Sequence, residues 1–86
     1  MVERNVTIVN KLGMHARASA QFVSFVYRFK CDITLIRDTK KANAKSILNL
    51  LMMSLNCGSE ITVRVEGENE EDVLDSIVNY IENMKD

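Results

Sequence analysis

The sequence lacks the features that are typical of membrane, secreted and nucleic-acid-binding proteins. It contains no apolar run of about 18 residues, the length that a helix needs to cross a bilayer. The first residues, Met-Val-Glu-Arg-Asn, have neither the basic nor the apolar region of a signal peptide. Eleven Lys and Arg residues against twelve Asp and Glu residues give a net charge of −1, which does not favour binding to nucleic acid or to an acidic membrane. We therefore expect a cytoplasmic protein with no nucleic-acid partner and no direct membrane insertion.

Side chains that hold metals or carry redox chemistry are also scarce. The chain has one histidine and two cysteines, Cys31 and Cys57, which lack the CxxC spacing of zinc and redox sites. These residues do not make a usual ligand set, which argues against a small metal or redox protein. We expect no cofactor and no metal, and we expect both cysteines in or near the core.

The chain is short and uniform in its organisation. At 86 residues it is long enough for one hydrophobic core, and 47% hydrophobic with 27% charged residues is typical of a globular protein. No linker, internal repeat or low-complexity segment interrupts it. We therefore expect one domain over residues 1–86.

Hydrophobic periodicity predicts a mixture of strands and helices. Alternation of apolar and polar residues indicates strands, and apolar residues three or four apart indicate helices. The elements expected in chain order are a strand over 4–9, a helix over 16–29, a strand over 31–37, a weakly indicated edge strand over 42–44, a helix over 47–55, a strand over 60–67 and a helix over 68–84. This βαββαβα order predicts an α+β open-faced sandwich, a four-stranded antiparallel sheet with three helices on one face.

The predicted helix over 47–55 has more apolar residues than one buried stripe can hold. Ser46 is a plausible N-cap, because its hydroxyl can accept a hydrogen bond from an N–H group of the first turn. Leu50 and Met53 can face inward. A second stripe is left for solvent or for a partner, and it comprises Ile47, Leu48, Leu51, Met52 and Leu55.

The most informative segment runs from Asn10 to Ala20 and contains the only histidine. Gly13 marks a turn after the first strand, so His15 is expected just before the first turn of the following helix. The first N–H groups of a helix have no partner within it, and the macrodipole adds partial positive charge there. Arg17 adds a permanent cation whose planar fork suits phosphate or carboxylate. The segment therefore predicts an anion site beside His15.

The residues alone allow two interpretations of His15. It could be a polar loop or capping residue, or it could act as a nucleophile toward phosphorus and form a labile phosphohistidine. Phosphoryl transfer needs mainly positioning and charge stabilisation, which the N–H groups and Arg17 would supply. The sequence has no Gly-rich phosphate loop and no paired metal-binding carboxylates. Such a chain would be a stoichiometric carrier of a group that another protein supplies, and not an enzyme.

The segment Asn-Lys-Leu-Gly-Met-His-Ala-Arg-Ala-Ser-Ala at 10–20 resembles the active-centre signature of HPr. HPr is the histidine-containing phosphocarrier of the bacterial phosphoenolpyruvate-dependent sugar phosphotransferase system, and its usual signature reads Gly-Leu-His-Ala-Arg-Pro-Ala. Lys45-Ser46-Ile47 resembles the family's regulatory serine segment, and the order of elements extends the resemblance over the whole chain.

The resemblance implies a phosphocarrier. His15 would be phosphorylated on Nδ1 by enzyme I and would pass the phosphoryl group to EIIA domains of sugar permeases, while Arg17 neutralises its charge. The implied surface that docks both partners comprises Ala20, Ile47, Leu48 and Leu51. In bacteria that have HPr kinase/phosphorylase, Ser46 would be phosphorylated, with a transcriptional regulator as a further partner, although Ser46 could equally be a plain N-cap. A carrier that presents one site to successive partners is expected to be a monomer.

Three positions depart from the family pattern. Ala18 stands where the family has proline, so the fixed φ at the helix start and the restriction on Arg17 are missing. Ser24 and Asn49 stand where many members carry a basic residue that faces acidic partners. We expect a working site with a looser Arg17, and slower or more specialised encounter with partners.

Two alternative functions remain open from the sequence. The nitrogen-related branch of the same family has a similar signature, and its members would use the same carrier chemistry for a regulatory output. A binding module would instead use the apolar stripe around Ile47 to dock on a transcription factor or an enzyme, with His15 idle.

Overall fold

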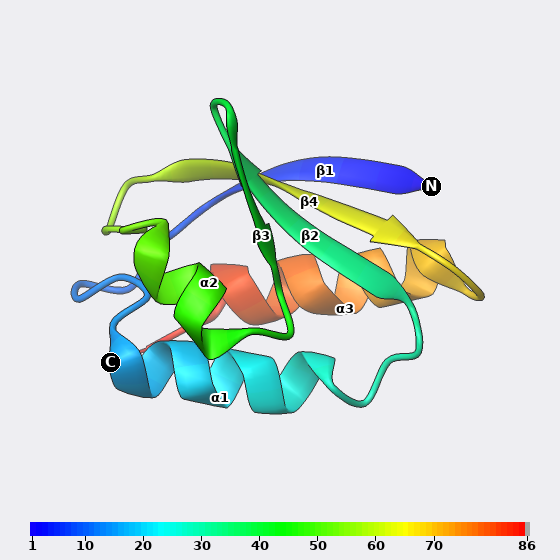
Figure 1. Ribbon diagram of the computed structural model, residues 1–86, viewed down its shortest axis with the longest axis horizontal. Coiled ribbons are helices and arrows are strands. Elements are labelled where there is room, and N and C mark those ends of the chain that lie inside the picture. The colour runs from blue at the N-terminus through cyan, green and yellow to red at the C-terminus, as the bar shows by residue number, and fades with distance from the viewer. Residues whose placement is uncertain (86) are drawn as a thin grey trace.

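Seven elements follow one another in the order βαββαβα in the computed structural model, which describes residues 1–85 (Figure 1). They are β1 (Val2–Thr7), α1 (Ala16–Val26), β2 (Asp32–Arg37), β3 (Lys40–Asn43), α2 (Ile47–Met52), β4 (Glu60–Glu66) and α3 (Glu70–Glu82). The strands form an antiparallel sheet in the spatial order β1-β4-β2-β3. The predicted α+β open-faced sandwich is thereby confirmed.

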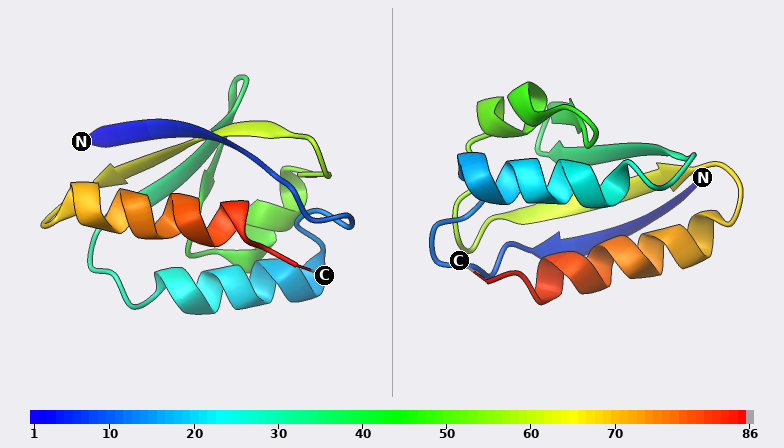
Figure 2. Two further views of the ribbon diagram at one scale, coloured as in Figure 1. Left: turned by 180° about the vertical axis from the view of Figure 1, so that it is seen from behind. Right: turned by 90° about the horizontal axis from the view of Figure 1, so that it is seen from below.

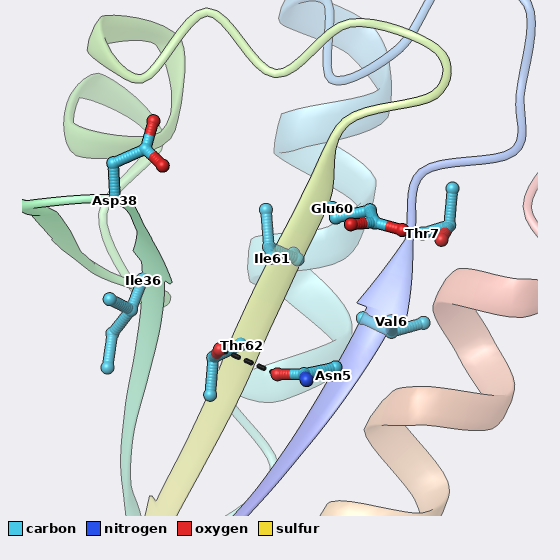
Figure 3. Close-up of a pocket in the computed structure, with 8 residues that line it drawn as sticks. All are labelled: Asn5, Val6, Thr7, Ile36, Asp38, Glu60, Ile61 and Thr62. Atoms are coloured by element: carbon cyan, nitrogen blue, oxygen red, sulfur yellow. Dashed lines mark hydrogen bonds between the residues drawn. The ribbon is translucent and has the colours of Figure 1, made fainter.

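The helices α1, α2 and α3 cover the same face of the sheet (Figures 1 and 2). α3 packs against β1 and β4, whereas α2 packs against β3 and α1. On the opposite face, the Thr62 hydroxyl of β4 donates a hydrogen bond to Asn5 Oδ1 of β1 at 2.8 Å, beside a shallow hollow of about 360 Å³ (Figure 3). None of the residues that the sequence predicts as functional lines this hollow. The candidate site therefore lies elsewhere.

The core forms where the alternating apolar residues of the strands meet the helices. Val6 of β1 lies opposite Ile61 of β4, and Leu35 of β2 lies opposite Val63. These four side chains are at most 5% exposed, as the alternation predicts. The helices contribute the buried residues Phe22, Val23, Val26, Val73, Leu74, Ile77, Val78 and Ile81. Burial of each large apolar side chain is worth about 1.5–3 kcal/mol, so this layer supplies most of the stabilisation.

The first strand lies two residues earlier than predicted. β1 runs from Val2 to Thr7 instead of 4–9, and Ile8 follows it as a fully buried residue. The N–H of Ile8 donates to the carbonyl of Ser59 at 2.9 Å, which keeps the chain beside the β4 region after the strand ends. The alternation of apolar and polar residues indicated the buried face correctly, but it could not show at which residue the pairing with β4 ends.

The edge strand β3 also differs from its predicted range of 42–44. Arg37 of β2 already pairs with Lys40 across a tight turn, in which Asp38 takes a positive φ of 55°. Lys40 and Lys41 therefore belong to the strand and not to the turn. Their polarity suggested a turn, because an exposed edge strand and a turn can have the same composition.

α1 ends at Val26 instead of continuing to Phe29. The N–H groups of Arg28 and Phe29 donate to carbonyls three positions back, at 3.4 and 3.1 Å, so the chain tightens and leaves the α-helical ladder. Lys45 Nζ then donates to the carbonyl of Phe29 at 2.6 Å and satisfies a free acceptor near this end.

α3 begins at Glu70 instead of 68, because Asn69 has a φ of 56° and cannot be part of the right-handed helix. The helix ends at Glu82, and Met84 lies beyond it but still packs against the core. α3 has 13 residues, and within residues 1–85 no helix is long and apolar enough to cross a bilayer.

α2 is shorter than predicted, and its shortening changes the exposed stripe. The helix ends at Met52, and Ser54 has a φ of 53° that turns the chain out of the helical direction. Leu50 and Met53 are buried, as predicted. Leu55 is only 2% exposed, so its assignment to the exposed stripe is wrong. That assignment continued a helical periodicity past the point at which the helix stops.

The two cysteines lie in different surroundings, and both thiols are free. Cys31 is buried, as predicted, whereas Cys57 is exposed in the connection between α2 and β4. The expectation that both lie in or near the core is wrong for Cys57. Its segment turns at Gly58, which has a φ of 90° and whose N–H donates to the carbonyl of Ile8 at 2.7 Å.

Candidate functional site

His15 is the residue immediately before α1, where the sequence predicts it. Its backbone is extended, with φ −69° and ψ 178°, and its carbonyl accepts the first hydrogen bond of the helix from the N–H of Ser19 at 2.8 Å. The His15 side chain is half-buried, whereas that of Arg17 in the first helical turn is exposed. The hydrogen bond to its carbonyl therefore fixes the backbone of His15 relative to the first turn of α1.

Further hydrogen bonds fix the backbone on the N-terminal side of His15. In the preceding turn, Gly13 N–H donates to the Asn10 carbonyl at 3.1 Å, and Asn10 Nδ2 donates to the Gly13 carbonyl at 2.7 Å. The Ser19 hydroxyl donates to the Met14 carbonyl at 2.9 Å. The N–H of Met14 donates to the Leu55 carbonyl at 2.8 Å, and the Met14 side chain is buried. The loop that carries His15 is thus attached both to α1 and to the connection that follows α2.

Gly13 allows the close approach between these two segments. Its φ is +65°, and a Cβ placed there would lie 2.4 Å from the Leu55 carbonyl oxygen and 2.8 Å from the Asn56 Cα. Any side chain would therefore collide with backbone atoms that cannot move aside cheaply. The sequence indicated a turn at Gly13, but the contact with residues 55 and 56 depends on the tertiary fold.

The start of α1 is suited to an anion. The N–H groups of Ala16, Arg17 and Ala18 precede the first hydrogen bond of the helix and so have no acceptor within it. They carry the partial positive charge of the helix dipole, which favours a phosphate or carboxylate at this position.

A hollow of about 200 Å³ lies at this end of α1 and brings together residues from both ends of the chain. Its lining comprises His15, Arg17, Ala18, Gln21 and Lys85. The sequence predicted the meeting of His15 and Arg17. It missed Gln21, which helical spacing from Arg17 could have indicated, and Lys85, for which no local signal exists.

The described residues that line this hollow carry positive charge. Arg17 and Lys85 are cations, and none of the lining residues within 1–85 is a carboxylate. Tyr80 lies in an adjoining hollow of about 320 Å³, which shares Ala18, Gln21 and Lys85 with the first. Burial raises the pKa of the Tyr80 phenol, so its hydroxyl stays neutral and adds no negative charge beside the site. Within residues 1–85, no group of three or more His, Cys, Asp or Glu side chains is arranged to hold a metal ion.

Ser46 caps α2, as the sequence predicts. Its hydroxyl oxygen accepts a hydrogen bond from the N–H of Asn49 at 3.2 Å. The side chain of Asn49 in turn accepts from the N–H of Asn43 at 3.3 Å. Asn49, one of the positions at which a basic residue was missing, is therefore part of the hydrogen bonding that joins α2 to β3.

The remaining predicted partner-binding residues lie on the surfaces of α1 and α2, which pack against each other. Ala20 is exposed on α1. Ile47, Leu48 and Leu51 are 41%, 66% and 40% exposed on α2, and Met52 is 68% exposed. We call Ile47, Leu48, Leu51 and Met52 the α2 stripe. Large apolar side chains grouped in this way are typical of a surface that binds another protein.

The family of the chain follows from comparison with known proteins. The family model described as the PTS HPr component phosphorylation site matches residues 2–83. The chain belongs to the HPr family. As a member of that family it is a phosphocarrier of the phosphotransferase system.

Members of the HPr family match this chain over nearly its whole length. The phosphocarrier protein HPr of Cupriavidus necator is 35% identical over 83 residues, which cover 96% of this chain and 93% of that protein. The phosphocarrier protein NPr of Shewanella violacea is 42% identical over 76 residues, which cover 88% and 84% of the two chains. A crystal structure of HPr from Thermoanaerobacter tengcongensis has a TM-score of 0.90 at 36% identity and covers 95% and 92% of the two chains. HPr of that organism was also crystallised as a dimer, which matches with a TM-score of 0.73.

Gly13→Ala tests how strongly the HPr-type site depends on the contact with residues 55 and 56. Gly58→Ala is the matched control, because Gly58 also has a positive φ but no atom lies within 4 Å of its missing Cβ. The control is expected to lose about 1–2 kcal/mol of unfolding free energy from backbone strain alone. Gly13→Ala is expected to lose more, because the collision adds to the strain. Urea unfolding followed by circular dichroism measures both, and an equal loss in the two variants would contradict the role assigned to the contact.

Proposed function

We propose that this chain accepts a phosphoryl group on His15 from phosphorylated enzyme I and passes it to EIIA domains of sugar permeases. The observation that carries the proposal is the position of His15 at the start of α1, in one hollow with Arg17. The family membership supports a phosphocarrier, and this geometry supports His15 as the residue that carries the group.

The proposed reaction is a displacement at phosphorus. A ring nitrogen of His15 supplies the electron pair for the new N–P bond, while the bond from phosphorus to the donor breaks and its electron pair leaves with the donor. Negative charge on the transferred oxygens is met by Arg17 and by the N–H groups of Ala16, Arg17 and Ala18. Transfer to the next protein is the same reaction with the roles of donor and acceptor exchanged.

The chain acts in this scheme as a stoichiometric carrier and not as an enzyme. Each molecule is modified in one transfer and restored in the next, and the partner proteins bring the donor and the acceptor groups. The site itself contributes position and charge, which are the main requirements of phosphoryl transfer. We expect the carrier to work in the cytoplasm.

The docking surface that we assign to both partners comprises Ala20 on α1 and three residues of the α2 stripe, Ile47, Leu48 and Leu51. Its support is the exposure of Ile47, Leu48 and Leu51 beside the helix that starts at His15. A partner that covers these side chains removes apolar surface from water and brings its own reactive group close to His15. We propose that the carrier docks as a monomer, because enzyme I and EIIA must reach the same surface in turn.

We further propose that Ser46 is a regulatory phosphorylation site for HPr kinase/phosphorylase, with a transcriptional regulator among the partners of the modified form. Ser46 lies directly before the exposed Ile47, so a phosphate there would place a dianion at the edge of the apolar docking surface. Partner binding would weaken, because the apolar contact would have to form beside a strongly hydrated charge.

The nitrogen branch remains the second candidate, and the similarity to NPr of Shewanella violacea favours keeping it. The carrier chemistry on His15 would be the same, and only the acceptor would differ. A pure binding module that uses the α2 stripe is the less favoured alternative, because it gives no role to the meeting of His15 and Arg17.

The carrier reaction is tested by incubating the chain with enzyme I and labelled phosphoenolpyruvate. One acid-labile phosphate per chain is expected, because a phosphoramidate is hydrolysed readily in acid, and His15→Ala is expected to take up none. Ser46→Ala is the matched control and should be labelled like the parent chain. An acid-stable label, no label on the parent, or full labelling of His15→Ala would reject the carrier function.

A second experiment offers the labelled chain to sugar-branch and nitrogen-branch EIIA domains. The rates of transfer to the two kinds of domain then distinguish the two branches.

Ala18→Pro tests whether the missing proline leaves Arg17 loose. Ala18 is the third residue of α1, so proline would remove an N–H that makes no bond within the helix. A compatible proline typically adds about 0.4–1 kcal/mol of stability. If the same free energy is gained at the transition state, transfer accelerates about two- to five-fold. Ala16→Pro, which loses an N–H beside His15 without restricting Arg17, serves as the control and should not accelerate transfer; no gain in Ala18→Pro would contradict the interpretation.

Regulation through Ser46 is tested with HPr kinase/phosphorylase and ATP, followed by mass spectrometry to locate the phosphate. Phosphate on Ser46 is expected, and modification elsewhere or none rejects the proposal.

Ser46→Ala separately measures the contribution of the cap, whose loss should cost about 1 kcal/mol of unfolding free energy. Ser76→Ala, at an exposed position within α3, should change stability much less.

A further inference from the structure

We propose that Lys85 is a second phosphoryl-binding cation of the site, acting beside Arg17. This inference rests on the proposed function of His15 and extends it to a residue near the other end of the chain. Its basis is that Lys85 lines the same hollow as His15 and Arg17.

The placement of Lys85 follows from the way α3 ends. Asn83 closes the helix, with its N–H donating to the Asn79 and Tyr80 carbonyls at 3.2 Å each and its Nδ2 donating to the Asn79 carbonyl at 2.7 Å. Met84 then packs against the core. These contacts direct residues 83–85 toward the start of α1, as the red end of the ribbon shows in Figures 1 and 2. Lys85 therefore reaches the hollow from the segment that follows α3, whereas His15 and Arg17 reach it from the start of α1.

The charge in the hollow is favourable for an anion although the protein as a whole is not basic. Arg17 and Lys85 line it, and none of the lining residues within 1–85 is a carboxylate, while the whole chain has a net charge of −1. The ammonium of a lysine is a compact charge on a flexible stem, so Lys85 can follow the phosphoryl oxygens as the group arrives and leaves. Arg17 has to act from the first turn of α1, where Ala18 leaves it less restricted than proline would.

The expected contribution is modest because Lys85 is exposed to solvent. Exposed charge pairs are weakened by water and salt, so the loss of this charge should change phosphate affinity by about three-fold and not by orders of magnitude. The effect should also decline as the salt concentration rises.

The test titrates the unphosphorylated chain with inorganic phosphate and follows the backbone amide signals of Ala18 and Gln21 by NMR. Lys85→Gln should bind phosphate about three-fold more weakly at low salt, and the difference should shrink at high salt. Lys85→Arg should restore the affinity. Lys30→Gln is the control, because it removes one exposed positive charge beyond the opposite end of α1.

Unchanged phosphate affinity in Lys85→Gln, or an equal loss in Lys30→Gln, would overturn the proposal. The same variants are then labelled by enzyme I and phosphoenolpyruvate, where slower labelling of Lys85→Gln alone is expected. Failure of the carrier function looks different, because no variant and no parent chain would take up label on His15. Labelling of all variants at the parental rate, with parental phosphate affinity, rejects only the role of Lys85.

Discussion

The hydrogen bond from the N–H of Met14 to the carbonyl of Leu55 is the interaction on which the site depends most. It ties the loop that carries His15 to the connection after α2, and it forms only because Gly13 brings the two backbones within contact. The same connection contains the end of α2, where Leu55 turns inward. One backbone contact therefore fixes His15, the proposed phosphoryl acceptor, relative to α2, the helix proposed to carry most of the docking surface. A carrier needs this relation to be constant, because each partner would contact His15 and the docking surface at the same time.

In the proposed mechanism, local dipoles and two cations would give the site its affinity for phosphate, in a protein whose charges otherwise nearly balance. Arg17 and Lys85 line one small hollow at the start of α1, where the first N–H groups have no acceptor within the helix. Ser46 and Asn49 make hydrogen bonds that define the start of α2. In this arrangement the apolar α2 stripe, and not a broad basic surface, supplies most of the contact with partners.

Much of the architecture could be predicted from the sequence because it depends on local periodicity. The faces of Val6, Leu35 and Val63, the cap at Ser46 and the position of His15 before α1 all follow from neighbours a few residues away. What failed depends on distant contacts: the strand range of β3, the end of α2 at Met52 and the burial of Leu55. Lys85 could not be predicted as part of the site, since only the packed fold brings the end of α3 to the start of α1.

The small volume of the hollow beside His15 has a consequence for the lifetime of the phosphorylated form. Within residues 1–85, the depression of about 200 Å³ is lined by side chains of α1, His15 and Lys85, and a docked partner would close it. A phosphoryl group held there would be sheltered from water during each encounter and exposed between encounters. The survival of the phosphoryl group would then depend on the rate of hydrolysis relative to the rate of diffusion to the next protein. Abundance of partners, more than any feature of the carrier itself, would decide how much of the phosphoryl group reaches its destination.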